Sequence, residues 1–276
     1  MPKSIFFKLN KFADMNLNLI GKTAVVCGST QGLGLASAVE LALLGANIVL
    51  MARNEEKLKN TLPKLDNSKG QTHSYLVADF ADTAQVKKAI ESFVADNRVA
   101  HILVNNTGGP AGGTALNANE TEFLQAFNSH LICNHVLVQA LVPGMKQAGF
   151  GRIINVISTS VKQPLQGLGV SNTIRAAVAN WSKTLSFELG SFGITVNNVL
   201  PGFTQTVRAD YVIEKKAADS GLSAAEVLAA LEKEIPVGRI GQPEEFGAAV
   251  AFLASPAAAY INGINLPVDG GRLTSL

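Results

Sequence analysis

The sequence predicts an α/β fold in which helices cover both faces of a doubly wound parallel sheet. Short apolar segments alternate with amphipathic segments along the chain, as expected for strands joined by crossover helices. The first strand-to-helix junction is rich in glycine, with Gly28, Gly32 and Gly34 close together. No change of composition divides the 276 residues, so we expect a single domain over residues 20–276, preceded by an arm at residues 1–19.

Each expected strand is a short apolar run that ends in a polar or glycine-containing turn. The runs cover residues 23–27, 46–52, 71–78, 101–105, 151–157, 194–200 and 264–268. Apolar residues at helical spacing predict a helix after each of the first three runs, and further helices over residues 120–146, 171–189 and 243–254. Residues 207–235 are predicted to form an inserted pair of short, mostly polar helices. Ligands of such a sheet bind beyond the carboxyl ends of its strands.

Composition narrows the classes of function. With 47% hydrophobic and 16% charged residues the chain is a packed globular protein, and its formal net charge of +2 gives no reason to expect a nucleic-acid or membrane partner. No apolar run reaches the roughly 18 residues of a membrane span, and we do not expect the N-terminal residues to act as a secretory signal. Cys27 and Cys133 have no ligand-type neighbours, so we expect two buried free thiols, no metal site, and a reducing compartment such as the cytoplasm.

The glycine-rich junction predicts a dinucleotide site. A buried strand that breaks into glycines and then into a helix brings backbone N–H groups and a helix N-terminus to a pyrophosphate. Glycine is needed because a Cβ would block this close approach and because the turn visits positive φ. The residues expected to bind the cofactor here are Gly28, Ser29, Thr30, Gln31, Gly32, Leu33 and Gly34. The alternative is a glycine turn that binds no ligand.

The end of the second strand predicts NADP(H) rather than NAD as the cofactor. An acidic residue there would bind the adenosine ribose, but the strand ends in Ala52-Arg53-Asn54, without a carboxylate. A guanidinium is a charged, bidentate donor, so Arg53 is expected to bind the 2′-phosphate; the alternative is a solvated loop charge. Asp79 and Phe80 follow the third strand and are assigned to the same site. There Asp79 is expected to accept from the adenine amino group or, alternatively, to cap the next helix.

Five motifs in order resemble those of the short-chain dehydrogenase/reductase family, over essentially the whole chain from about Leu19 onward. Residues 28–34 look like its Gly-x-x-x-Gly-x-Gly loop, and the other motifs lie at residues 105–108, 151–158, 197–202 and 267–271. The resemblance implies a Rossmann-type sheet with strand order 3-2-1-4-5-6-7 and a helical lid near residues 207–235. It also implies a homodimer or homotetramer packed through the helices at residues 120–146 and 171–189.

The same resemblance implies further cofactor contacts and an activity. The residues that it adds are Asn106, Thr107 and Gly108 after the fourth strand, and Pro201, Gly202, Thr204 and Thr206 near the nicotinamide. For the two threonines the alternative role is to cap the lid helix. The implied reaction is hydride transfer between NADP(H) and a small-molecule carbonyl or alcohol, similar to that of a 3-oxoacyl reductase.

The chain departs from the family at three of the four active-site positions, which are normally Asn, Ser, Tyr and Lys. Ser158 matches the serine, whereas Ser171 and Arg175 replace Tyr-x-x-x-Lys by Ser-x-x-x-Arg, and His130 stands where the asparagine is expected. A serine hydroxyl is a far weaker acid than a phenol, and Arg175 stays protonated. Proton transfer of the tyrosine type is therefore not expected at Ser171.

Two functional hypotheses follow. In the first, the chain is an enzyme in which Ser158 polarises the carbonyl and Arg175 holds the ribose or the developing oxyanion. His130 supplies the proton through water, since the pKa of histidine lies near neutral. The space left by the tyrosine ring would admit a larger or carboxylate-bearing substrate that Arg175 clamps. Structural alternatives are a merely packed His130, a salt-bridged Arg175 and an N-capping Ser171. In the second hypothesis, the protein binds NADP(H) without turnover, as a sensor or interaction partner.

Overall fold

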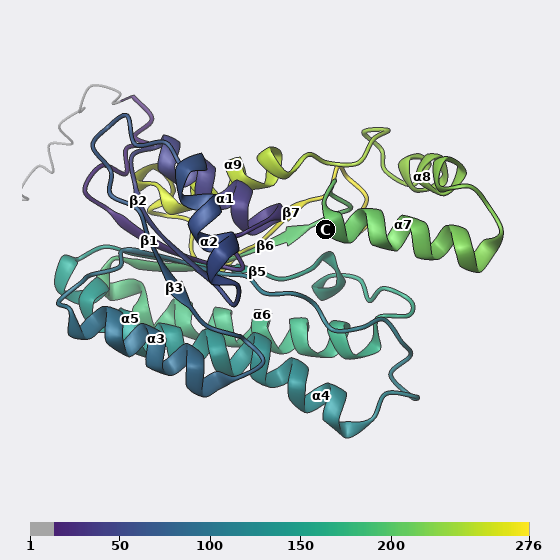
Figure 1. Ribbon diagram of the computed structural model, residues 1–276, viewed down its shortest axis with the longest axis horizontal. Helices are drawn as coiled ribbons and strands as arrows, with labels where there is room; N and C mark the ends of the chain where they lie inside the picture. The colour runs from purple at the N-terminus through teal and green to yellow at the C-terminus, as the bar shows by residue number, and fades with distance from the viewer. Residues whose placement is uncertain (1–13, 276) are drawn as a thin grey trace, which may run out of the picture.

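A seven-stranded parallel sheet forms the centre of the protein, as Figure 1 shows. The computed structural model describes residues 14–275. The strands are β1 Thr23–Cys27, β2 Asn47–Ala52, β3 Ser74–Val77, β4 Ile102–Asn105, β5 Gly151–Val156, β6 Ile194–Pro201 and β7 Asn265–Val268. They pair in the order β3-β2-β1-β4-β5-β6-β7, and every pair is parallel. The predicted fold class and strand order are confirmed.

Helices cover both faces of the sheet (Figure 1), so the central strands are buried on two sides. The layer on one face consists of α1 (Gly32–Leu43), α2 (Glu55–Thr61) and α9 (Pro243–Ala254). The layer on the other face consists of α3 (Thr83–Ala95), α5 (Cys133–Ala148) and α6 (Gly169–Leu189). Strands buried on both faces are almost continuously apolar, which explains why short apolar runs located them in the sequence.

The insertion over residues 207–235 forms the predicted pair of helices. They are α7 (Val207–Ser220) and α8 (Ala224–Lys233). Ile213, Val227 and Leu231 form a small core of their own between them. Figure 1 shows both helices extending from the end of the sheet where β6 terminates. The insertion thus stands beside the carboxyl ends of the strands, where a lid is expected.

The third strand is shorter than its apolar pattern predicts. It covers Ser74–Val77 rather than residues 71–78. Before Ser74, hydrogen bonds from side chains take the place of backbone pairing with β2. Gln71 donates from Nε2 to the Ala42 carbonyl, and His73 accepts from the Ile48 backbone at Nδ1. These side-chain contacts hold the segment beside the sheet without backbone pairing.

The long helix predicted over residues 120–146 contains an irregular turn. It begins as α4 (Glu120–Phe127), passes through a π-helical turn at Asn128–Ile132, and continues as α5 to Ala148. A π-turn inserts one extra residue into the helix and is frequent at functional sites. His130 lies inside this turn, so the irregularity falls at the position where the family pattern places its asparagine.

Part of the predicted N-terminal arm belongs to the packed domain. Residues 1–13 of the arm lie outside the described residues. Leu19 is completely buried, its backbone N–H donates to the Leu44 carbonyl, and the Asn16 carbonyl accepts from Ala257. The domain therefore begins before residue 20, because this segment covers the edge of the core between α1 and α9.

A ladder of asparagines crosses the sheet. Asn105, Asn155, Asn198 and Asn265 stand opposite one another on β4, β5, β6 and β7. Their side chains form hydrogen bonds of 2.8 Å, 3.1 Å and 2.8 Å along this row, and Asn155 also donates to Ser182 of α6 at 2.8 Å. Buried amides that satisfy one another fix the register of the strands that carry the site.

Replacing Asn155 by alanine should destabilise the protein by about 3 kcal/mol. The change leaves a buried N–H of Asn105 and a buried carbonyl of Asn198 without a partner, and each unpaired buried group costs about 1–3 kcal/mol. The measurement is the free energy of unfolding in urea. Asn180→Ala, at an exposed position of α6, is the control and should change stability by less than about 0.5 kcal/mol. A loss below about 1 kcal/mol in Asn155→Ala would contradict the role of the ladder.

Candidate active site

The glycine turn between β1 and α1 is held in a conformation that side chains do not tolerate. Gly28 and Gly32 have φ of 57° and 54°, and a Cβ on Gly34 would lie 2.2 Å from the Gly28 carbonyl oxygen. Asn106 Nδ2 approaches the carbonyl oxygens of Cys27 and Gly28, at 3.3 Å each. The turn therefore exposes its backbone at the end of β1, with α1 beginning directly behind it.

A cavity of 570 Å³ extends from this turn across the ends of β2 and β3. It is lined by the glycine turn, the end of β2 and the start of α2, the segments that follow β3 and β4, and the π-helical turn, namely Gly28, Thr30, Gln31, Ala52, Arg53, Asn54, Lys57, Ala78, Asp79, Phe80, Ala81, Thr107, Gly108, Gly109 and Ser129. Arg53 and Lys57 both lie along its β2 side. Lys57 was missed in the sequence, although it lies in the first turn of the helix that follows Arg53.

A second cavity of 330 Å³ continues from the turn toward the lid. Its lining includes Gln31, Gly32, Leu33, Asn106, Thr107, Gly108, Pro201, Gly202, Thr204, Thr206 and the lid residues Val207 and Arg208. The two cavities share Gly28, Gln31 and the segment 107–109, so together they form one cleft along the carboxyl ends of the strands. The cleft brings together most of the cofactor residues predicted from the sequence.

Two predicted cofactor residues, Ser29 and Gly34, support the cleft without lining it, and the alternative capping roles of Asp79 and Thr206 are decided by the structure. Ser29 is completely buried, and its hydroxyl accepts from the Met51 backbone at 3.1 Å. Asp79 does not cap the next helix, because Asp82 is the N-cap of α3. Thr206 caps α7 by accepting from the Ala209 backbone at 3.3 Å, and it also lines the cleft. Gly34 packs against the Gly28 carbonyl beneath the turn, so a side chain there would force the turn to move.

Ser158 lies two residues after the last residue of β5, at the carboxyl end of the sheet. It is the N-cap of a short 3-10 helix, and its Oγ accepts from the Ser160 backbone at 3.1 Å. Because this bond uses a lone pair, the hydroxyl proton is left to donate. The serine is thus oriented by the backbone and can polarise a carbonyl oxygen.

Arg175 extends from α6 to the carboxyl end of β5. Its side chain is buried, and Nη1 donates to the Val156 carbonyl at 2.8 Å, two residues before Ser158. Nε has no hydrogen-bond partner among residues 14–275, and none of the ion pairs there involves Arg175. The alternative of a salt-bridged Arg175 is therefore wrong. Burial lowers the pKa of Arg175 to about 10, which leaves it charged at neutral pH.

His130 is buried in the π-turn close to Arg175. Burial, together with the positive charge of Arg175, lowers the pKa of His130 to about 3, although a hydrogen bond with the Gly108 backbone acts in the opposite direction. The expectation of a near-neutral pKa is wrong, because the sequence does not reveal that the imidazole loses its solvent beside a cation. His130 is neutral at pH 7 and offers one N–H and one acceptor nitrogen.

His130 also lines a third cavity of 480 Å³, which adjoins the cleft. Gly108, Gly109 and Ser129 line both this cavity and the cleft. The imidazole therefore lies between solvent-accessible space and the buried guanidinium of Arg175.

Ser171 does not N-cap α6 as the sequence suggested. The helix begins at Gly169, its N-cap is Leu168, and Ser171 lies within the first turn. The neighbouring Asn172 holds the preceding loop by donating from Nδ2 to the Leu165 carbonyl at 2.8 Å. Ser158, Arg175 and His130 converge on one end of the sheet, with Ser171 one helical turn from Arg175.

Comparison with known proteins assigns the chain to a family. A family profile described as enoyl-(acyl carrier protein) reductase matches residues 28–272. A 3-oxoacyl-(acyl-carrier-protein) reductase of Pseudomonas aeruginosa is 34% identical over 264 residues, which cover 94% of this chain and 100% of the relative. The chain belongs to the short-chain dehydrogenase/reductase family.

Solved structures agree with this membership. An L-sorbose reductase from Gluconobacter frateurii, complexed with NADPH and L-sorbose, has a TM-score of 0.89 at 33% identity, covering 95% of this chain and 100% of that one. An actinorhodin polyketide ketoreductase with NADPH has a TM-score of 0.84 at 30% identity, covering 91% and 97%. This short-chain dehydrogenase/reductase thus shares its whole architecture with reductases that carry NADPH.

Residues 14–275 contain neither a metal-binding cluster nor a membrane-spanning helix. No cluster of three or more His, Cys, Asp or Glu side chains there is arranged to hold a metal ion. No helix in the same part of the chain is long and apolar enough to cross a membrane. Cys27 and Cys133 are buried free thiols, as expected.

The lowered pKa of His130 predicts a loss of stability in acid. Histidine has a pKa of about 6.5 in the unfolded chain, so between pH 6.5 and pH 3 the unfolded state binds a proton that the folded state does not. The contribution of His130 to the free energy of unfolding is therefore constant above pH 6.5 and falls as the pH falls from 6.5 to 3. Urea unfolding should show that the wild type loses about 2 kcal/mol more than His130→Asn between pH 7 and pH 5. Equal losses in both proteins would contradict the burial of a neutral imidazole.

Proposed function

We propose that this protein is an NADP(H)-dependent oxidoreductase that reduces a carbonyl compound with a rearranged set of active-site groups. The observation that carries the proposal is the cleft from the glycine turn to the lid, which adjoins the cavity of His130 at Gly108 and Gly109, next to the buried Arg175. Relatives at 30–34% identity are named as 3-oxoacyl or polyketide ketoreductases. A binder without catalytic function has less support, because Ser158 and the lid are both present.

The cleft fits a phosphorylated dinucleotide. The glycine turn would accept the pyrophosphate, since a Cβ on Gly34 would overlap the Gly28 carbonyl and the backbone is left bare. Arg53 and Lys57 line the β2 side, where the family places the adenosine ribose, and they would bind the 2′-phosphate. Asp79 and Phe80 would border the adenine, and Thr204 and Thr206 would face the nicotinamide end.

Each protein group has a distinct part in the reduction. Bound NADPH supplies the hydride. Ser158 donates its hydroxyl proton in a hydrogen bond to the carbonyl oxygen, and the charge of Arg175 stabilises the negative charge that grows there. Neutral His130 holds a water molecule by hydrogen bonding, and this water delivers the proton to the oxygen. His130 therefore positions the donor and does not act as an imidazolium acid.

Arg53→Ala tests the cofactor assignment. Loss of a charge-assisted contact to the 2′-phosphate should raise the dissociation constant for NADPH by roughly 10- to 100-fold. The dissociation constant for NADH, which lacks that phosphate, should change by less than about 2-fold. Calorimetry measures both, and Lys64→Ala, on the turn after α2 and outside the cleft, is the charge-matched control. Equal weakening for both nucleotides would remove Arg53 from the phosphate site.

Consumption of NADPH with a panel of ketones, aldehydes and quinones tests the activity. Ser158→Ala should lower kcat by about 100-fold or more, because an aligned donor to the oxyanion is lost, with little change in NADPH affinity. His130→Asn should also slow turnover. Thr173→Ala, on the exposed side of the first turns of α6, is the control. Tight binding of NADPH with no turnover of any compound would instead favour the sensor.

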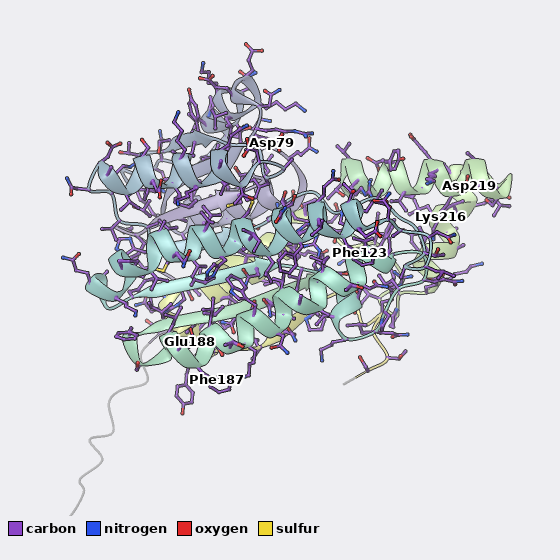
Figure 2. The ribbon with its side chains drawn as sticks, turned by 90° about the horizontal axis from the view of Figure 1, so that it is seen from below. Asp79, Phe123, Phe187, Glu188, Lys216 and Asp219 are labelled. Atoms are coloured by element: carbon purple, nitrogen blue, oxygen red, sulfur yellow. The ribbon has the colours of Figure 1, made fainter. Side chains whose placement is uncertain are left out.

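We also propose a homodimer or homotetramer that packs through α4, α5 and α6. Phe187 of α6 is 77% exposed and Leu124 of α4 is 61% exposed. Figure 2 shows Phe187 at the outer edge of the molecule, away from the lid. Large exposed apolar side chains on neighbouring helices are typical of a subunit interface.

Phe187→Asp should weaken this assembly. The added charge would be buried in the contact, so the molar mass measured by light scattering should fall toward that of a monomer. Phe192→Asp, outside the three helices, is the control. An unchanged mass for Phe187→Asp would exclude α6 from the interface.

The two thiols support a cytoplasmic location, which we propose as the site of action. Cys27 and Cys133 are both unpaired. Free buried thiols persist in a reducing compartment, where disulfides are rare.

A further inference from the structure

Arg175 presents an unused pair of N–H donors beside the reacting position. Nη1 is occupied by the Val156 carbonyl, whereas Nε is buried without a partner and Nη2 makes no hydrogen bond within residues 14–275. Nε and Nη2 lie on one edge of the planar guanidinium, and their N–H groups form a parallel fork. Such a fork matches the two oxygens of a carboxylate.

The charge of Arg175 also lacks a counter-charge. The four ion pairs within residues 14–275 lie at the surface, and none involves this side chain. The nearby imidazole of His130 is neutral. Burying a cation without an anion is costly, and the cost is present throughout the catalytic cycle, whereas an oxyanion exists only briefly. A ligand that brings a permanent negative charge would remove this cost of burying an unpaired cation.

The backbone of Gly109 lies next to the guanidinium, which is buried and lines none of the three cavities. A Cβ built on Gly109 would lie 3.6 Å from Arg175 Nη2. Residues 108–113, which we call the glycine segment, contain four glycines and are mostly exposed. Within the described chain, residues 108–112 make no backbone–backbone hydrogen bond, and Gly113 is anchored to Gly167 and Gly169. Apart from the hydrogen bond between the Gly108 backbone and the His130 side chain, little holds residues 108–112, so this segment opens at low cost in free energy.

We propose that Arg175 binds a carboxylate of the substrate, so that this protein reduces oxo acids whose carboxylate lies one or two carbons from the reacting carbonyl. The inference rests on the proposed reductase function and specifies its substrate class. Because Nη1 bonds the carbonyl two residues before Ser158, a carboxylate at Arg175 and a carbonyl at Ser158 would be neighbours on one small molecule. The glycine segment moves aside to admit it.

The proposed reaction balances as a two-electron reduction. Hydride from NADPH forms a new C–H bond at the carbonyl carbon, and the π electrons of the C=O bond move to oxygen. The oxygen takes one proton from the water, and the hydroxide that remains regains a proton from bulk solvent, so one H⁺ is consumed and the products are a 2- or 3-hydroxy acid and NADP⁺. The carboxylate stays ionised and bound to Arg175 throughout.

The first test compares acids with neutral isosteres in the wild type. Acetoacetate and 2-oxobutyrate should be reduced with kcat/KM at least about 10-fold higher than their methyl esters, which is the effect of one charge-assisted contact. Reduction of the esters with equal or higher efficiency would overturn the carboxylate site while leaving the reductase function intact. This comparison needs no variant.

The second test measures binding without turnover. In the NADPH-loaded protein, calorimetry should give a dissociation constant for 3-hydroxybutyrate at least about 10-fold below that of its amide. Arg175→Met should abolish this difference and Arg175→Lys should retain part of it, with the urea unfolding transition as the check that each variant is folded. Lys162→Met removes another positive charge, at the C-cap of the short 3-10 helix that follows Ser158. This variant should leave the difference in affinity unchanged.

The two tests separate the two ideas. Arg175-dependent binding of the carboxylate without NADPH consumption would support the site and contradict the reductase function. Turnover of neutral ketones together with equal affinity for acid and amide would contradict the site alone. A preference for the acid that survives in Arg175→Met would assign the carboxylate to another residue and would also overturn the proposal.

Discussion

The side chain of Asn106 holds the centre of the cleft together. Its amide approaches the carbonyl oxygens of Cys27 and Gly28, so the end of β4 is tied to the glycine turn after β1. The missing side chain of Gly34 makes this contact possible, because a Cβ there would lie 2.7 Å from the same amide nitrogen. Both cavities of the cleft start at this junction. The cofactor site, the segment after β4 and the catalytic edge all depend on it.

Local patterns predicted the sheet and the cleft, because both follow from features close in sequence. Apolar runs located the strands, and α9 has the predicted bounds Pro243–Ala254. The errors arise where distant residues decide. Side chains that bond across the chain shorten the third strand at His73, and Leu19 is buried by α1 and α9 rather than by its own segment. Lys57 was overlooked because its place in the cavity depends on how α2 docks.

The catalytic group shows the same division between position and environment. The motifs placed Ser158 and Arg175 in the candidate site, but the pKa of His130 depends on burial and on a cation 45 positions away in the sequence. Likewise, the absence of a salt bridge at Arg175 reflects which carboxylates fold nearby. By the resemblance, arginine stands in place of lysine and keeps the charge while adding donors, and histidine stands in place of asparagine as another neutral group. If the proposed roles hold, these changes move the site from phenol chemistry toward anion recognition.

The asparagine ladder has a direction. Each amide gives its N–H to the next strand, from Asn105 through Asn155 and Asn198 to Asn265, and Asn105 Oδ1 is left as an acceptor without a donor. Turning one amide over would set donor against donor, so the row can reverse only as a whole. Ser182 accepts a hydrogen bond from Asn155 and its hydroxyl donates one to the Val178 carbonyl. The direction of the row therefore continues into α6, the helix that carries Arg175. The directed row of hydrogen bonds thus ends on a backbone carbonyl of α6, three residues after Arg175.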